Sequence, residues 1–327
     1  MKQPLNQSPK QSKPTTSQAK PTTGIVSMIA SVVSIDSISR VVKQFVSSDP
    51  ALYYENVGFD AIENKQTALE TDVHKPVWQN CGYWEGQSTY IQACERLTHK
   101  VGELAELDTA DVALDVGFGF GEQDIYWVKN FAVKKIVGIN ITPFQVEAAQ
   151  KRAAAADCGD RIDYQQGDAV QLPIEDASVD RVIALQSAFQ FNTRDAFFKE
   201  AFRVLKPNGI LVLADMIQTD GKTRSLNPWS WFTRRRVAWP HQNVYSATPY
   251  RQHLQSQGFS VQMIDSIRES VYTGMREYIG RRYRGERAED IVIDASAVPS
   301  AEKASKLWQF HYGVDDYVLV KAIKPAE

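Results

Sequence analysis

The stretch Ala110-Asp111-Val112-Ala113-Leu114-Asp115-Val116-Gly117-Phe118-Gly119-Phe120-Gly121-Glu122 decides the fold of this chain of 327 residues. Its apolar half predicts a buried strand over 112–116, because a short aliphatic run bounded by turn residues is typical of a parallel sheet. The three alternate glycines permit positive φ and leave no Cβ to keep a ligand away from the main chain. A helix is expected to begin near Glu122, and amides at a helix start attract anionic groups. The stretch therefore predicts a nucleotide-type binding loop.

Two kinds of ligand fit such a loop. A dinucleotide site favours G-x-G-x-x-G, whereas this loop reads G-x-G-x-G with Asp115 two residues before the first glycine. A carboxylate at that point favours a ligand with an ammonium or sulfonium group. The pattern D-x-G-x-G-x-G resembles the first motif of class I S-adenosylmethionine (SAM) methyltransferases. The resemblance implies that Asp115, Gly117, Gly119 and Gly121 bind SAM, while the motif alone leaves the dinucleotide alternative open.

The next strand, predicted over 135–139, ends at Asn140. Most class I methyltransferases have an acidic residue there for the ribose hydroxyls; an amide can donate to one hydroxyl and accept from the other. Thr142 is expected to cap the following helix, with Pro143 at its first position. The pattern G-x-x-[IL]-[ST]-x-x-Q over 138–145 looks like the branch that includes tocopherol and sterol methyltransferases and cyclopropane fatty-acid synthases. That resemblance implies cofactor contacts for Asn140, Thr142 and Gln145; an ordinary capped helix is the alternative.

Two further strand ends extend the resemblance. A strand predicted over 161–166 leads into Asp168 and Ala169, and the family uses such a carboxylate to accept the exocyclic amine of adenine. A strand over 179–185 opens onto Gln186, which completes the implied cofactor set. The segment 198–209 is also similar to the superfamily, so the resemblance covers about residues 80–215. Motifs of enzymes that methylate nucleic-acid bases are absent.

The alternation of strands and helices predicts an α/β, Rossmann-like fold. We expect a seven-stranded, mostly parallel sheet with helices on both faces and a reversed last strand over 316–323. Ligands of such sheets bind outside the carboxyl ends of the strands, near the switch in strand order. The polar residues that end four successive strands should therefore meet at one edge.

Three regions are expected along the chain. Residues 1–23 are polar and rich in Pro, Ser and Thr, which predicts a disordered tail. Residues 24–85 are expected to form a helical cap, and 86–327 the methyltransferase domain with lid insertions at about 218–246 and 270–312. The apolar periodicity of 24–46 suits helices that pack on the domain; a peripheral membrane contact is the alternative.

Composition limits the partners. The net charge of −2 gives no general attraction to nucleic acid, so no nucleic-acid partner is expected. Three sparse cysteines favour a reducing compartment, hence a cytoplasmic location. The sequence has no uninterrupted apolar run of about 18 residues, so no membrane-spanning helix is expected. No group of His, Asp or Glu residues has the spacing of a metal site. Composition leaves the oligomeric state open.

The predicted reaction is methyl transfer from SAM to a small, hydrophobic metabolite through an oxygen, nitrogen or carbon acceptor. Such a reaction depends mainly on alignment of the methyl donor with the acceptor and on exclusion of water, and a base is needed only if the acceptor loses a proton. Candidate bases are His241 in the lid and Asp215 at a strand end, whereas Tyr83 and Trp84 are candidates for cofactor contact. Alternatives are a lipid-modifying enzyme of the cyclopropane-synthase type and a non-catalytic SAM-binding protein.

Overall fold

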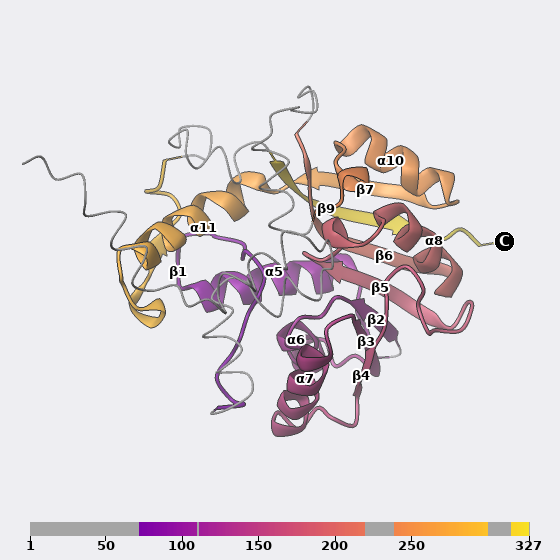
Figure 1. The fold of residues 1–327 in the computed structure, drawn as a ribbon, viewed down its shortest axis with the longest axis horizontal. Coiled ribbons are helices and arrows are strands. Elements are labelled where there is room, and N and C mark those ends of the chain that lie inside the picture. The colour runs from indigo at the N-terminus through magenta and orange to yellow at the C-terminus, as the bar shows by residue number, and fades with distance from the viewer. Residues whose placement is uncertain (1–71, 110, 220–238, 300–314, 327) are drawn as a thin grey trace, which may run out of the picture. The chain divides into compact units, whose positions relative to one another are not determined.

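The computed structural model describes residues 72–109, 111–219, 239–299 and 315–326. These residues form a seven-stranded sheet in the order β4-β3-β2-β5-β6-β9-β7 (Figure 1). The first five strands of that order run parallel, and β9 is antiparallel to both of its neighbours. The strands are β2 (Val112–Val116), β3 (Lys135–Asn140), β4 (Ile162–Gln166), β5 (Val179–Leu185), β6 (Leu205–Gln218), β7 (Ser260–Ser266) and β9 (Asp315–Ile323). The predicted fold, including its reversed last strand, is confirmed.

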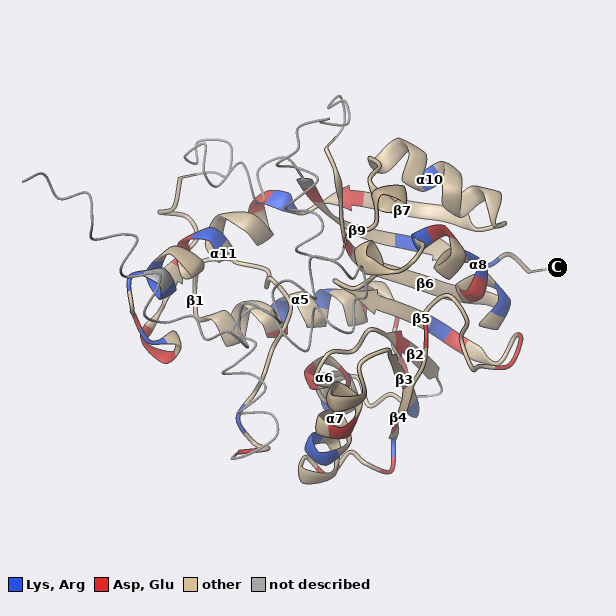
Figure 2. Cartoon of the chain, viewed as in Figure 1, with Lys and Arg blue, Asp and Glu red and all other residues tan. Residues whose placement is uncertain are grey.

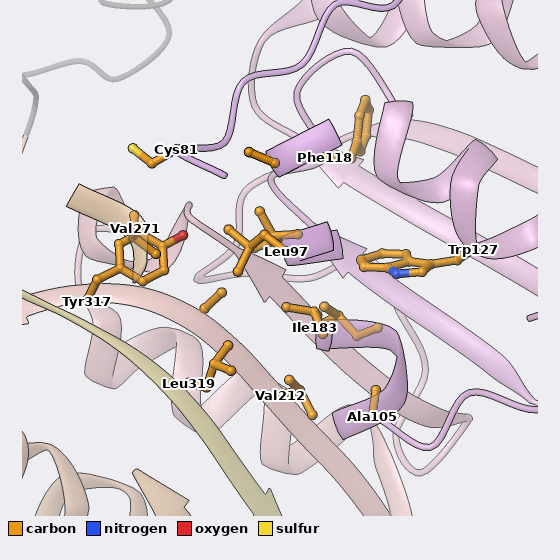
Figure 3. Packing of buried hydrophobic residues seen from close by; sticks show 14 of the residues in the cluster. Cys81, Leu97, Ala105, Phe118, Trp127, Ile183, Val212, Val271, Tyr317 and Leu319 are labelled. Carbon is orange, nitrogen blue, oxygen red and sulfur yellow. The ribbon is translucent and has the colours of Figure 1, made fainter. Parts of the chain in front are cut away.

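Helices cover both faces of the sheet. Alternate residues of each strand point to opposite faces, so Ala113 of β2 belongs to one apolar core and Leu114 to the other. The first core also contains Leu97 and Trp127, and Figure 3 shows these side chains packed over Ile183. The helices on this face are α5 (Tyr90–Leu104), α6 (Glu122–Asn130), α7 (Pro143–Ala155) and α11 (Arg268–Tyr283), and those on the other are α8 (Arg194–Val204) and α10 (Ala247–Ser256).

Shorter elements complete the fold. A two-stranded antiparallel sheet joins β1 (Gln87–Ser88) to β8 (Ile293–Asp294). Within the described ranges, the 3₁₀ turns are η2 (Ala188–Gln190), η3 (His241–Asn243) and η4 (Ala288–Asp290).

The structure departs from what the sequence suggests in two places. The stretch Lys206-Pro207-Asn208-Gly209 has a composition typical of a turn, but it lies inside β6, because Leu205 already pairs with Val179 before the register shifts. The described end of the predicted helical cap, 72–85, contains turns and irregular chain and no helix. Residues 1–71 and 220–238 lie outside the described residues, so the predictions for the tail, for 24–46 and for most of the first lid stay untested there.

Three arginines at the end of α11 and in the loop after it, Arg281, Arg284 and Arg287, are paired with acidic groups. Arg281 contacts Glu286 at 2.5 Å and Arg284 contacts Glu277 at 3.1 Å. Figure 2 shows both signs of charge along this helix. The run is therefore a solvated surface with its charges balanced.

Among the described residues, no helix is both long and apolar enough to cross a bilayer.

Candidate active site

The three glycines of the loop after β2 adopt the backbone conformation that the sequence predicts. Gly117, Gly119 and Gly121 have φ angles of +85°, +60° and +81°, a region that other residues rarely occupy. A Cβ added to Gly117 would lie 2.4 Å from Cβ of Ser187, and one added to Gly119 would lie 2.5 Å from Oε1 of Gln79. The loop therefore needs glycine both for its backbone angles and for the close approach of neighbouring chain.

Asp115 lies in β2 directly before the loop, and its side chain is buried. Its Oδ2 accepts a hydrogen bond of 2.9 Å from Nε2 of Gln123, while Oδ1 has no hydrogen-bond partner among the described residues. Burial raises the pKa of Asp115 to about 6. A buried negative charge is costly unless a positive charge lies near it. The Asp115 carboxylate therefore favours a ligand that brings a positively charged group to this edge of the sheet.

Asn140, the last residue of β3, begins a row of side-chain amides. Its Nδ2 donates to Oε1 of Gln145 at 3.1 Å, and Nε2 of Gln145 donates to Oε1 of Gln79 at 3.0 Å. Asn140 and Gln145 are both buried. The row ends beside Gly119, and amides can donate to and accept from neighbouring hydroxyls. This arrangement fits the ribose of a nucleoside.

Thr142 is the first residue outside α7, and Pro143 opens the helix as predicted. The expected side-chain cap is wrong, because the Thr142 hydroxyl makes no capping bond and has no partner among the described residues. In a side-chain cap the Thr142 hydroxyl would accept a hydrogen bond from the backbone amide of Gln145. That amide donates instead to the carbonyl oxygen of Thr142 at 3.1 Å. Oδ1 of Asn140 also accepts from the Thr142 amide at 3.0 Å. A buried, unpartnered hydroxyl thus remains next to the row of amides.

Asp168 and Ala169 follow β4 at the same edge of the sheet. Asp168 is exposed, and its Oδ1 accepts from the amide of Val170 at 3.1 Å, whereas Ala169 is buried. Gln186 follows β5 with a φ of +56°. Since β4, β3, β2 and β5 are adjacent and parallel, the predicted residues at their ends lie along one edge.

An irregular segment, 75–81, crosses this edge, and we call it the strap. Arg152 donates to the carbonyl oxygen of Lys75 at 2.7 Å, and the amide of Val77 donates to Oε1 of Glu122 at 3.1 Å. At the other end, the Cys81 amide donates to Oε1 of Gln186 at 2.8 Å. The strap is therefore tied to α6, to α7 and to the end of β5, and it carries Gln79 to the glycine loop.

The same Gln186 oxygen also accepts from the hydroxyl of Tyr317 on β9 at 3.0 Å. Figure 3 shows Tyr317 beside Val271, on the side of the cluster where Cys81 lies. Gln186 therefore serves the strap and β9 in this structure.

Tyr83 and Trp84 lie beyond the strap, toward α5 and α11. Nε1 of Trp84 donates to the carbonyl oxygen of Cys81 at 2.8 Å, and its ring packs so closely on Gly274 that an added Cβ would lie 2.2 Å away. The ring centroids of Trp84 and Tyr278 are 6.0 Å apart. The Tyr83 ring lies under the ammonium group of Lys100, at 4.4 Å. Both aromatic residues thus have protein partners in the described structure.

Asp215 lies in β6 and is fully buried against Arg194. Its Oδ2 is 2.9 Å from Nε of Arg194 and accepts from the hydroxyl of Tyr250 at 3.0 Å. Its Oδ1 accepts from the Met216 amide at 2.9 Å. Burial raises the pKa of Asp215, and the Arg194 charge and these two donors oppose the rise. Such a set of contacts is typical of a structural ion pair.

His241 begins η3 and is exposed. Its neighbour Asn243 is buried, and Nδ2 of Asn243 donates to the carbonyl oxygens of Phe189 at 3.0 Å and Phe191 at 2.7 Å. Arg194 donates to the Asn243 carbonyl oxygen at 2.9 Å. Asn243 therefore joins the segment that carries His241 to the chain after β5.

Sequence reasoning missed three residues of this site. Gln79 lies in the aromatic segment before α5, in which the sequence predicts cofactor contacts only for the aromatic residues Tyr83 and Trp84. Asp124 is buried in the first turn of α6, and the only local signal is a carboxylate at a position where the helix faces the sheet. Arg194 is fully buried, and no spacing in the sequence links it to Asp215.

Comparisons with known proteins agree with this geometry. The family profile described as "Methyltransferase domain" matches residues 114–213. The Erythromycin 3''-O-methyltransferase of Saccharopolyspora erythraea is 33% identical over 254 residues, which cover 75% of this chain and 83% of that protein. The 27-O-demethylrifamycin SV methyltransferase of Amycolatopsis mediterranei is 39% identical over 137 residues, which cover 42% of this chain and 50% of that protein.

Among solved structures, the [4+2]-cyclase SpnF has a TM-score of 0.63 and 24% sequence identity, with 84% of this chain and 97% of that chain covered. This likeness shows the fold. The extended match to the erythromycin enzyme, together with the domain match, shows the family. The chain belongs to the class I SAM-dependent methyltransferases that act on small molecules.

Proposed function

We propose that this methyltransferase acts on a hydroxyl group of a bulky, largely apolar natural product. The observation that carries the proposal is the 33% identity over 254 residues with an enzyme named for methylation of an antibiotic hydroxyl. The second relative is also named for a position that carries an oxygen.

In this proposal the cofactor lies along the carboxyl edge of β4, β3, β2 and β5. Asp115 and the amides of the glycine loop hold its amino-acid end, and Asn140, Gln145 and Gln79 hold its ribose. Asp168 and Ala169 flank its adenine, and Thr142 offers its unpartnered hydroxyl. Gln186, Tyr83 and Trp84 support the strap that covers this edge.

When bound, SAM supplies a methyl carbon that is already activated for in-line attack. The chain then has to align the acceptor oxygen, exclude water and remove one proton. We propose His241 as the base. Asp215 is the other candidate, but its contacts with Arg194, Tyr250 and Met216 favour a structural role.

The test is an assay of the purified chain with deuteromethyl-SAM and a panel of hydroxylated polyketides, their O-methylated forms, and sterols. We expect a deuterated methyl ether from a free hydroxyl and no product from the matched O-methylated form. Labelling of the blocked form would place the methyl group on nitrogen or carbon instead. Labelling of sterols alone would support the lipid alternative, and SAM binding without turnover on any class would support the binding-protein alternative.

A second candidate is carbon methylation of a lipid. The pattern over 138–145, with Gln145 on the first turn of α7, supports it, since that pattern resembles the sterol and cyclopropane branch. A cytoplasmic location, and a membrane contact through residues 24–46, remain predictions.

A further inference from the structure

A second carboxylic acid lies next to Asp115. Asp124, in the first turn of α6, is fully buried, and neither of its carboxyl oxygens receives a hydrogen bond from the described residues. Its carboxyl group is within hydrogen-bonding reach of the Asp115 carboxyl group. Asp124 belongs to no element of the loop motif and has no role in the mechanism above.

Two carboxylates in contact inside a protein cannot both be ionised at modest cost, so one proton stays between them. Asp115 has a second donor, the Gln123 amide at 2.9 Å. The backbone of Val116 also lowers the pKa of Asp115 through a hydrogen bond. Asp124 has the hydroxyl of Tyr164 within reach, and that hydroxyl donates to the carbonyl oxygen of Gly121 at 3.2 Å. The negative charge is therefore better placed on Asp115, and the proton on Asp124.

The other charged group near this pair does not compete for the proton. Glu122, on the same turn of α6, forms an ion pair with Arg152.

We propose that Asp124 is a positioning residue: it remains a neutral carboxylic acid at physiological pH and donates its proton to Oδ1 of Asp115. Asp115 then stays ionised and correctly oriented for the positively charged end of SAM. The second step rests on the cofactor placement proposed above, whereas the first concerns the free protein alone.

The proposal implies a definite pH dependence. Burial raises the pKa of Asp115 to about 6, and the hydrogen bond from Asp124 limits this rise in the pKa. Burial raises the pKa of Asp124 well above its usual range. SAM affinity should therefore fall as the pH drops through about 6, and loss of the Asp124 donor should move that fall to higher pH.

The test compares Asp124→Leu, which cannot donate, with Asp124→Asn, whose amide can. Carbon-13 NMR of labelled aspartate follows the Asp115 carboxyl in the free protein, and calorimetry follows SAM binding at pH 6 and pH 8. For Asp124→Leu we expect the Asp115 midpoint to rise by about one pH unit. SAM affinity should then fall about fivefold at pH 6 and less than about twofold at pH 8. Asp124→Asn should remain close to the wild type at both values.

An unchanged Asp115 midpoint in Asp124→Leu, or an equal shift in Asp124→Asn, would overturn the proposal. The wild-type spectrum is a test that needs no variant, since the Asp124 carboxyl should show the shift of a neutral acid at pH 7. An ionised Asp124 there would also overturn it. Asp115→Asn separates the two proposals: wild-type SAM affinity in that variant would refute the cofactor placement and leave the free-protein titration to decide the role of Asp124.

Discussion

Oε1 of Gln79 lies 2.5 Å from the position that a Cβ of Gly119 would occupy. The same oxygen accepts from Gln145 at 3.0 Å. One side chain of the strap thus joins the glycine loop to the first turn of α7. Two elements of the proposed cofactor site are therefore connected by a segment that precedes both in the chain.

Gly119→Ala should weaken SAM binding by at least about tenfold, because the methyl group strains a positive φ and displaces Gln79. Gly86→Ala is the matched control, since Gly86 has a φ of +56° but nothing within 4 Å of an added Cβ. The control should cost about 1 kcal/mol of stability and leave SAM affinity unchanged. Calorimetry and thermal unfolding measure the two effects. Equal affinities in the two variants would remove Gly119 from the proposed cofactor site.

Gln79→Ala should raise the dissociation constant for SAM about fivefold to tenfold, because the buried Gln145 amide loses its acceptor and the strap loses this hydrogen bond to α7. Gln262→Ala, on the exposed part of β7, should leave binding unchanged. Calorimetry on both variants measures the difference. Wild-type affinity in Gln79→Ala would remove Gln79 from the proposed ribose contacts.

Asp115→Asn should stabilise the free protein while it abolishes tight SAM binding. The folded pKa of Asp115 is raised to about 6 from 3.8. The folded state therefore holds a proton that the unfolded state has lost between about pH 4 and pH 6, and stability falls as the pH rises through that range. The neutral variant removes this loss, which amounts to about 2–3 kcal/mol at pH 7.

Urea unfolding at pH 7.5 and at pH 4 measures that gain. The stabilisation of Asp115→Asn should be present at pH 7.5 and nearly absent at pH 4. A gain of the same size at both values would mean that packing, and not charge burial, causes it.

Arg194→Met should destabilise the protein by about 3–5 kcal/mol, because it leaves the buried Asp215 carboxylate without its ion-pair partner. Lys206→Met is the control: Lys206 pairs with Asp180 at 2.8 Å, but its side chain is 42% exposed, so the loss should stay below about 1 kcal/mol. Urea unfolding compares the two. Similar losses in both would argue against a dominant role for the buried pair.

His241→Gln should lower kcat about 100-fold or more while KM for SAM stays unchanged, because only proton removal is affected. Asp215→Asn should instead lower stability, with a smaller effect on kcat per folded molecule. Steady-state kinetics at a temperature well below both unfolding midpoints separates the two candidates. A larger loss of kcat in Asp215→Asn than in His241→Gln would indicate that Asp215, and not His241, is the base.

Much of the architecture follows from patterns that neighbouring residues share. The aliphatic run over 112–116 predicts a strand from local sequence alone. The three alternate glycines predict a loop with positive φ angles, because access to positive φ is a property of each glycine by itself. Asn140 and Gln145 could likewise be assigned to the end of β3 and the first turn of α7. The side-chain cap of Thr142 could not, because a competing backbone contact with the Gln145 amide takes its place.

The sequence by itself therefore determined the strands and helices, the glycine loop and the edge of the sheet at which the predicted ligand-binding residues lie, because those signals are local in the chain. The tertiary structure alone decided which distant groups meet there: Gln79 with Gly119, Asp124 with Asp115, and Arg194 with Asp215. Such pairs have no characteristic spacing. Their electrostatics depend on burial, and burial exists only once the sheet and its helices have packed together.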